Sequence, residues 1–356
     1  MVILGSTGSI GVNTLLIAKR YNLAIEALVA GKNIDLLNQQ IAKFNPKFVA
    51  IADKADREKV KHSHVFCGDS GILELLELTT SPTIVNALVG YAGLAPTLKS
   101  IELGRKVALA NKESLVVAGE FIDMSKIIPI DSEHFGLWYL MNDRPFSKLY
   151  VTASGGTFRD WDINDMQKAS FSQALKHPNW SMGNKITIDS ATMTNKLFEL
   201  LEAKWLFGTS KIDAVIEKKS IIHALVEFAD GSTTAHFAGV DMKLPIAFAL
   251  NNKVEEEILP PVDLLGIGAI EFLPIKSERY PIWEIKQHLL ENSHLGVVIN
   301  AANEEAIKKF ERDECDFFSM SKMVLGAYKQ FDDAKATNMD EIIEIDREVR
   351  AYVNHP

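Results

Sequence analysis

Short apolar runs alternate with helical patterns over the first third of the chain. We expect strands at Val2–Leu4, Ala24–Ala30, Lys47–Ala52, His64–Cys67, Thr83–Leu88, Lys106–Ala110 and Lys126–Ile130. Apolar residues at helical spacing fill most of the gaps, as at Ile10–Arg20, Ile34–Phe44 and Leu94–Leu103. This alternation indicates βαβ units and therefore an α/β fold with a mostly parallel sheet.

The pattern changes after residue 131. Ile221–Phe228 and Ser232–Phe237 are strand-like and flank Asp230-Gly231, a common hairpin turn, so we expect a central α+β domain with an antiparallel hairpin. Residues 253–281 hold four prolines and little periodicity, which is typical of a linker. Helical patterns at Gly296–Arg312, Ser321–Gln330 and Met339–Val353 then predict a C-terminal helical domain.

We therefore divide the 356 residues into four segments, which are 1–131, 132–252, 253–282 and 283–356. Hydrophobic residues make up 47% of the chain and charged residues 24%, as in ordinary globular proteins. A net charge of −9 argues against nucleic acid as a partner. No run of about 18 apolar residues predicts a membrane span. Glycines interrupt the apolar N-terminus, so we expect no signal peptide.

The two cysteines, Cys67 and Cys315, match no metal-binding or disulfide pattern. Two reduced thiols are the expectation for a protein of the cytoplasm, where we place this chain.

A glycine-rich loop, Gly5-Ser-Thr-Gly8-Ser-Ile-Gly11, follows the first expected strand and opens a helix. Glycines let the backbone approach a pyrophosphate, whose charge lies at the helix N-terminus. The loop can also be a tight turn that binds nothing. Its context favours a Rossmann-like nucleotide-binding domain.

About 20 residues beyond this loop, an NAD-binding domain places an acid that binds the ribose 2′-hydroxyl. This chain has Gly31-Lys32-Asn33 there instead. Lys and Asn suit a 2′-phosphate, so we expect NADP rather than NAD; the alternative is a solvated lysine after a strand.

Asp131-Ser132-Glu133 follows the last expected strand of the parallel sheet, where α/β sites gather. Two carboxylates at a bend suit Mg²⁺ or Mn²⁺, although Asp and Ser also cap helices. If Ser190–Phe207 is one helix, Asn195, Lys196 and Glu199 share a face separate from its apolar residues. By periodicity alone, Lys196 and Glu199 are better explained as a surface ion pair.

The loop His177–Gly183 has proline near one end and glycine at the other, with Trp180 and Met182 inside. Such a loop can act as a lid over a ligand, or it can be an irregular connector. Ser154-Gly155-Gly156, after an expected strand at Leu149–Ala153, could offer backbone N–H groups to an anion.

Together these motifs resemble the 1-deoxy-D-xylulose 5-phosphate reductoisomerases, NADPH- and metal-dependent enzymes of non-mevalonate isoprenoid synthesis. The resemblance covers nearly the whole chain and rests on the motifs above, together with Ala110-Asn111-Lys112-Glu113, Asp189–Glu199 and Ser220-Ile-Ile-His223.

The resemblance implies a role for each matching residue. NADPH would be held by Thr7, Gly8, Ser9, Ile10, Gly31, Lys32, Asn33, Asn111, Glu113 and, on closure of the flap His177–Gly183, Gly183. Mg²⁺ or Mn²⁺ would be held by Asp131, Glu133 and Glu199. The substrate phosphate would be held by Ser154, His177, Ser190, Asn195 and Lys196, and its oxygenated carbons by Lys112 and Ser132. Lys112, Glu133 and His177 would be catalytic.

It also implies the reaction, in which 1-deoxy-D-xylulose 5-phosphate rearranges to an aldehyde that NADPH reduces to 2-C-methyl-D-erythritol 4-phosphate. Segment 1–131 would bind NADPH, 132–252 would carry the catalytic site, and the enzyme would be a homodimer. Two departures from the common pattern are Leu197-Phe198, where Gly-Leu is usual, and Thr157, where Pro is usual.

Two rival functions remain. A semialdehyde dehydrogenase shares an N-terminal NADP loop but needs a nucleophilic cysteine in its second domain. Cys67 lies in the expected nucleotide-binding domain and Cys315 in the helical tail. A non-catalytic NADPH sensor would lack some metal or phosphate ligands, whereas this chain has them all. Metal-dependent turnover would exclude the sensor.

Overall fold

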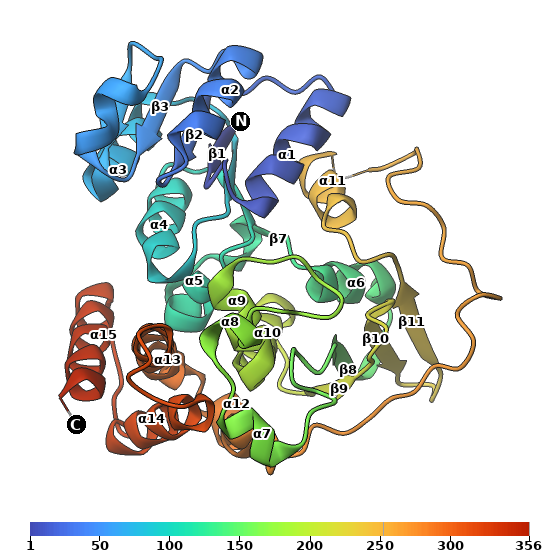
Figure 1. Cartoon of the computed structure of the whole chain (residues 1–356). Coiled ribbons are helices and arrows are strands. Elements are labelled where there is room, and N and C mark those ends of the chain that lie inside the picture. The colour runs from blue at the N-terminus through green and yellow to red at the C-terminus, as the bar shows by residue number, and fades with distance from the viewer. Residues whose placement is uncertain (252, 356) are drawn as a thin grey trace. The chain divides into compact units, whose positions relative to one another are not determined.

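The computed structural model describes residues 1–251 and 253–355 (Figure 1). The chain forms two compact units. Unit 1 comprises Met1–Ser114, Asp123–Asp131 and Asp241–Leu259. Unit 2 comprises Leu115–Ile122, Ser132–Val240 and the chain from Pro260 onward. The four-segment division stays a prediction, and two of its bounding residues, Asn252 and Pro356, lie outside the described residues.

Unit 1 contains a parallel sheet of seven strands in the order β4-β3-β2-β1-β5-β6-β7. The strands are β1 (Val2–Leu4), β2 (Ala27–Ala30), β3 (Phe48–Ile51), β4 (Val65–Cys67), β5 (Thr83–Asn86), β6 (Lys106–Leu109) and β7 (Ile127–Pro129). All seven confirm expected strands, most of them shorter by one to three residues. Their continuous apolar runs follow from burial on both faces of a parallel sheet.

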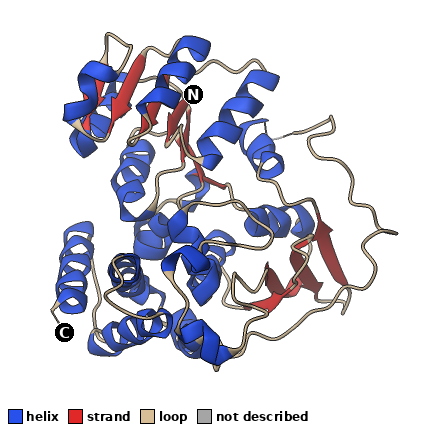
Figure 2. Ribbon diagram, viewed as in Figure 1, coloured by secondary structure: helices blue, strands red, loops and turns tan. Residues whose placement is uncertain are grey.

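Helices cover both faces of this sheet (Figure 2). Ile3 and Leu28 point to one face, where they pack with residues of α1 (Ser9–Arg20), α2 (Ile34–Phe44) and α11 (Lys243–Asn251). Their neighbours Leu4 and Ala27 point to the opposite face and pack with α3 (Gly68–Leu78). Alternation along each strand thus supplies two apolar layers from one sheet.

The carboxyl end of β1 is the switch point of the sheet. β1 lies between β2 and β5, so the chain winds outward in one direction from β1 to β4 and in the other from β5 to β7. Ligands of open α/β sheets bind at this edge. The glycine-rich loop begins there, directly after Leu4.

Unit 2 contains a mixed sheet in the order β11-β10-β8-β9. Its strands are β8 (Phe146–Ala153), β9 (Ile212–Ile216), β10 (Ile222–Phe228) and β11 (Thr233–Phe237). β10 pairs antiparallel with β11 and β8, which confirms the expected hairpin, and β8 pairs parallel with β9. Helix α6 (Ser132–Met141) packs on β10, β8 and β11.

The expected single helix Ser190–Phe207 is wrong. The chain forms α9 (Asn184–Thr192) and α10 (Thr194–Phe207), separated by Met193 in the left-handed conformation with φ 73°. No glycine or proline marks this break, so periodicity could not reveal it. The break lies just before Asn195, Lys196 and Glu199, which are expected to bind phosphate and metal.

The C-terminal helices of unit 2 confirm that the C-terminal region is helical, as expected. They are α12 (Lys286–Glu291), α13 (Gly296–Glu311), α14 (Phe317–Gln330) and α15 (Met339–Asn354). α13 is fastened to α9 because Asn303 Nδ2 donates to Asp189 Oδ1 at 2.7 Å. The expected linker holds no helix or strand between Lys253 and Tyr280, and Leu273 forms an isolated bridge with Ile216.

Shorter elements complete the described chain. The helices are α4 (Leu94–Glu102), α5 (Lys112–Ala118), α7 (Ile163–Gln167) and α8 (Phe171–Ala174). The 3-10 turns are η1 (Lys54–Lys59), η2 (Gly90–Gly93), η3 (Gly119–Phe121), η4 (Met124–Lys126), η5 (Pro281–Ile285) and η6 (Ser293–Leu295). Among the described residues, no helix combines the length and the apolar character that crossing a membrane requires.

Candidate active site

The glycine-rich loop of unit 1 is too tight for other residues at two of its positions. Gly5 has φ +86°, and a Cβ there would collide with the carbonyl of Ala87. A Cβ on Gly11 would collide with the carbonyl of Gly5 and the backbone of Ser6. Gly8 occupies the N-cap position of α1, and no side chain caps this helix. The first-turn N–H groups of α1 are therefore suited to an anion such as a pyrophosphate.

Gly31-Lys32-Asn33 lies at the carboxyl end of β2, beside β1 in the sheet. All three residues are exposed. Asn33 also has a structural role, because its Oδ1 accepts from Leu36 N at 3.2 Å and caps α2. Dinucleotide-binding folds recognise the adenosine ribose at this position.

The adjacent carboxyl ends of β6 and β7 bring Lys112 and Asp131 together. Both side chains are largely buried, and Lys112 Nζ lies 3.0 Å from Asp131 Oδ2. Asn111 is engaged by its own chain: its Nδ2 donates to the carbonyls of Leu88 and Gly90 and to Glu113 Oε2 at 2.8–3.1 Å. The side chains of Asn111 and Glu113 thus shape this end of the sheet.

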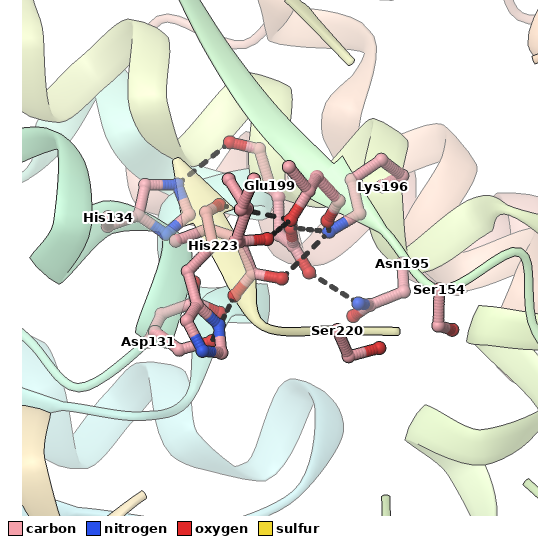
Figure 3. Close-up of polar contacts among 12 residues, drawn as sticks. Asp131, His134, Ser154, Asn195, Lys196, Glu199, Ser220 and His223 are labelled. Carbon is pink, nitrogen blue, oxygen red and sulfur yellow. Dashed lines mark hydrogen bonds and ion pairs between the residues drawn. The ribbon is translucent and has the colours of Figure 1, made fainter. Parts of the chain in front are cut away.

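In unit 2, two of the predicted metal ligands converge on one lysine (Figure 3). Lys196 Nζ lies 3.0 Å from Glu133 Oε1 and also donates to Glu199 Oε2 and the carbonyl of Thr152. Asn195 Nδ2 donates to Glu199 Oε1. The side chains of Lys196 and Glu199 are only 5% and 2% exposed, so the surface-pair explanation of these residues is wrong.

This cluster suits a hard divalent cation. Glu133 and Glu199 set two carboxylates against the single ammonium of Lys196, which leaves a net negative charge in a buried place. Carboxylate oxygens are the ligands that Mg²⁺ and Mn²⁺ prefer. Asp131 precedes Glu133 by two residues, so the chain itself keeps their Cα atoms within about 7.6 Å.

Ser154 and His177 form the second polar group of unit 2. Ser154 directly follows β8, and its Oγ lies 2.8 Å from His177 Nε2. His177 Nδ1 faces the backbone N–H groups of Asn179 and Trp180 at 3.1 and 2.9 Å, so it must accept and carries no proton. Nε2–H therefore donates to Ser154 Oγ, which also accepts from Gly156 N at 3.1 Å. The hydroxyl proton of Ser154 is left to donate to an anion.

Burial, together with the nearby positive charge of Arg159, lowers the pKa of His177 to about 4. The ring is thus neutral at physiological pH and acts through its Nε2–H.

The remaining predicted residues of unit 2 lie around α9. Ser190 is on its last turn, and a Cβ on Gly156, at φ +71°, would collide with the Ser190 backbone. The Ser154 loop therefore packs directly on this helix end. Gly183 is the N-cap of α9 and is exposed. Asn195 Oδ1 is buried and has no hydrogen-bond partner, so a ligand donor could satisfy it.

His223 contacts the site, although we had named no role for it. Its Nδ1 lies 3.1 Å from Ser132 Oγ, and Ser132 Oγ donates to Glu133 Oε2. Its Nε2 donates to the carbonyl of Ala238 at 3.2 Å, because a carbonyl can only accept. Because Ser132 has a single hydroxyl proton, a protonated ring donates from Nδ1 to Ser132 Oγ, and a neutral ring competes with Glu133 for the Ser132 proton. The sequence signal was the motif Ser220-Ile-Ile-His223.

Three family models match the chain. A model described as 1-deoxy-D-xylulose 5-phosphate reductoisomerase matches residues 1–119, and the one described as its C-terminal domain matches residues 127–207. A model described as DXP reductoisomerase C-terminal domain matches residues 237–352. A reductoisomerase from Nautilia profundicola is 58% identical over 99% of this chain and 98% of its own length. The chain belongs to the 1-deoxy-D-xylulose 5-phosphate reductoisomerase family.

Other reductoisomerases are similar over the same span. The enzyme from Campylobacter curvus is 55% identical, and that from Helicobacter pylori strain G27 is 51% identical, each over at least 98% of both chains. A crystal structure of the reductoisomerase in complex with NADPH, fosmidomycin and magnesium has a TM-score of 0.91 at 32% identity and covers 99% of this chain and 97% of its own. The Zymomonas mobilis enzyme in complex with NADPH has a TM-score of 0.88 at 31% identity, with the same coverage. These findings confirm the family and the fold expected from the sequence.

The two departures from the common reductoisomerase pattern have visible structural roles. Leu197 and Phe198 are both buried, and Lys185 Nζ lies 5.2 Å from the Phe198 ring centre. Thr157 Oγ1 donates to the carbonyl of Ala174 at 2.7 Å. Neither change removes a predicted ligand.

Proposed function

We propose that the residues described above carry the reductoisomerase reaction in this chain, the NADPH- and metal-dependent conversion of 1-deoxy-D-xylulose 5-phosphate to 2-C-methyl-D-erythritol 4-phosphate. The cofactor-binding residues are Thr7, Gly8, Ser9, Ile10, Gly31, Lys32, Asn33, Asn111, Glu113 and Gly183. The tight glycine loop and the uncapped start of α1 support the pyrophosphate site. Lys32 would bind a 2′-phosphate, and its exposed position after β2 supports NADPH over NADH.

Asp131, Glu133 and Glu199 would hold the divalent cation. When bound, the cation is a Lewis acid on the keto and hydroxyl oxygens of the substrate, and NADPH supplies the hydride. Lys112 and Ser132 orient the oxygenated carbons of the substrate. Ser132 is itself oriented by His223 at 3.1 Å.

Ser154, His177, Ser190, Asn195 and Lys196 would hold the phosphate. Ser154 donates its hydroxyl proton, because His177 Nε2–H and Gly156 N already fill its acceptor positions. Lys196 Nζ contacts Glu133 and Glu199, the carboxylates that would hold the cation, so with the cation bound its ammonium would be available to the phosphate. Binding energy at the phosphate, remote from the reacting carbons, can then orient the rest of the substrate.

The observation that carries this proposal is the convergence of Glu133 and Glu199 on Lys196 in a buried cluster. The test is consumption of NADPH with 1-deoxy-D-xylulose 5-phosphate, followed by the loss of nicotinamide absorbance. Oxidation that requires Mg²⁺ or Mn²⁺, stops with a chelator and fails with NADH supports the proposal. Oxidation that continues after the metal is removed contradicts it.

We also propose that two copies form a homodimer in the cytoplasm. Trp138 and Tyr139 on α6 are 51% and 54% exposed. α6 packs on the mixed sheet, whose edge strand β11 exposes Phe237. Exposed apolar side chains beside a free sheet edge are typical of an interface. Cys67 and Cys315 are free thiols, as expected in a reducing compartment.

A further inference from the structure

Arg159 lies outside every motif that pointed to the function, yet it contacts the backbone of Ser154, a residue of the proposed phosphate site. It follows the Ser154-Gly155-Gly156 loop, and its side chain is 14% exposed. Nη1 donates to the carbonyl of Ser154 at 2.9 Å and to that of Lys218 at 2.7 Å. A Cβ on Gly155 would lie 2.8 Å from Arg159 Cβ, so the loop folds closely over this side chain.

The flap is held to the same carbonyl. Asn179 Nδ2 donates to the carbonyl of Lys218 and to Ser220 Oγ, each at 2.7 Å. Arg159 Nη2 reaches Asn179 Oδ1 at 3.4 Å. The Lys218 carbonyl is therefore a shared anchor. Arg159 ties the Ser154 loop to it, and Asn179 ties to it the first part of the flap, residues 177–179, which we call the flap root.

The turn that presents this carbonyl is itself rigid. Glu217 is 1% exposed, and its carboxylate accepts from the backbone N–H groups of Lys219, Ile221 and Ile222 at 2.7, 2.9 and 3.3 Å. Ser220 adopts φ 57°, which turns the chain back toward β10. Three backbone hydrogen bonds to one buried carboxylate fix the Lys218 carbonyl in place.

His177 depends on the flap root for its orientation. Its Nδ1 accepts from the N–H groups of Asn179 and Trp180, which selects the tautomer whose Nε2–H points to Ser154. If Asn179 moves, the ring loses the contacts that select this tautomer. Both Nη1 hydrogens of Arg159 are donated to backbone carbonyls, so this group is not available as a phosphate ligand.

We propose that Arg159 is a positioning residue, which holds the Ser154 loop and the flap root to the Lys218 carbonyl so that Ser154 and His177 face the substrate phosphate in one fixed arrangement. This inference rests on the phosphate-binding role proposed above for Ser154 and His177. The planar fork of a guanidinium can serve both carbonyls and Asn179 at once, and an ammonium cannot match this geometry.

The experiment compares Arg159→Lys with Arg279→Lys. Arg279 is a matched control, because its guanidinium donates to the carbonyls of Phe158 and Trp161 at 2.8 Å and to Met166 Sδ, partners outside the Ser154 loop and the flap. For each variant we would measure KM for 1-deoxy-D-xylulose 5-phosphate, kcat, the Kd of NADPH and the ¹⁵N shifts of the His177 ring. The ring shifts are recorded on the substrate-free enzyme, so they test the positioning even where the phosphate assignment fails.

We expect Arg159→Lys to raise KM about tenfold, to change kcat much less, and to leave the Kd of NADPH unaltered, as for the loss of one charge-assisted contact. The His177 Nδ1 signal should move from that of a fixed acceptor toward an average of two tautomers. Arg279→Lys should change neither KM nor this signal. Equal effects of the two variants, or an unchanged His177 signal in Arg159→Lys, would overturn the proposal.

A second variant keeps the test decisive if Arg159→Lys folds poorly. Asn179→Ala removes the tie to the Lys218 carbonyl from the flap side, so it should raise KM and move the His177 signal in the same direction. Because both residues act through one carbonyl, the double variant should be little worse than either single one. Fully additive effects on KM would show that they act independently and would contradict the proposal.

Discussion

At the scale of residues, the site depends on where single protons and charges lie. His177 is neutral and donates from Nε2, since two backbone N–H groups occupy Nδ1. Ser154 is thereby left as a hydroxyl donor, in the role proposed for it toward the phosphate. Lys196 neutralises part of the charge of Glu133 and Glu199, which keeps two carboxylates close together. These assignments follow from hydrogen-bond partners, and sequence spacing could not supply them.

The pKa of His177 gives a prediction for pH. Burial lowers this pKa from 6.5 to about 4. Between pH 6.5 and 4, the ring is therefore protonated in the unfolded chain but not in the folded chain. The free energy of unfolding should therefore fall as pH falls from 6.5 to 4, and the full contribution is present above 6.5.

An NMR titration of the His177 ring checks this directly. The midpoint should lie near pH 4, and His177→Gln should reduce the loss of stability in acid. The pH dependence of the unfolding free energy that remains in this variant comes from other groups, such as His236, whose pKa burial also lowers to about 4. A His177 midpoint near 6.5 would show that the ring is solvated and not held as described.

At the scale of elements, the parallel sheet was predictable and the break between α9 and α10 was not. Strands buried on both faces leave apolar runs that local reading detects, so β1–β7 were placed within a few residues. Met193 carries no turn signal, yet it adopts φ 73°, and the residue is 2% exposed. The contacts of Arg159 and Asn179 with Lys218 join residues 59 and 39 positions apart, which periodicity cannot reveal.

Met193 gives a prediction at this scale. Met193→Ala should destabilise the fold by about 2–4 kcal/mol, because a buried side chain is lost. Met193→Gly loses the same side chain but relieves the left-handed backbone, so it should be more stable than Met193→Ala by about 1 kcal/mol. This order reverses the usual helix preference for alanine over glycine.

Urea denaturation of the two variants measures the difference. Leu200, which lies inside α10 and is 1% exposed, provides the control. There Leu200→Ala should be more stable than Leu200→Gly, as in an ordinary helix. If Met193→Ala is instead more stable than Met193→Gly, the two helices are continuous at this position and the account is wrong.

At the scale of the whole molecule, the family sequence models and relatives span nearly the entire chain. The order of the parallel sheet places the glycine-rich loop at its switch point, and unit 2 carries Glu133, Glu199 and the residues proposed to bind the phosphate. The sequence identified the family from a few long motifs. The dimer stays a prediction.

For the dimer we predict that Trp138→Glu shifts the enzyme from two copies to one. A charge buried in an apolar interface without a partner is strongly unfavourable. Sedimentation velocity across a range of protein concentrations measures the result. Ile343→Glu is the control, because Ile343 is 53% exposed on α15 and distant in sequence from α6. A wild-type enzyme that sediments as a monomer at all concentrations would refute the proposed assembly.

The proposed function depends most on the buried carboxylates around Lys196, which we propose to be the divalent metal site. The most direct measurement is the affinity of Mn²⁺ for the wild type and for Glu199→Gln, by calorimetry, with NADPH affinity and turnover recorded on the same samples. We predict that the variant binds Mn²⁺ at least about tenfold more weakly, loses nearly all turnover and keeps its NADPH affinity. Unchanged Mn²⁺ affinity with retained, metal-dependent turnover would contradict the account.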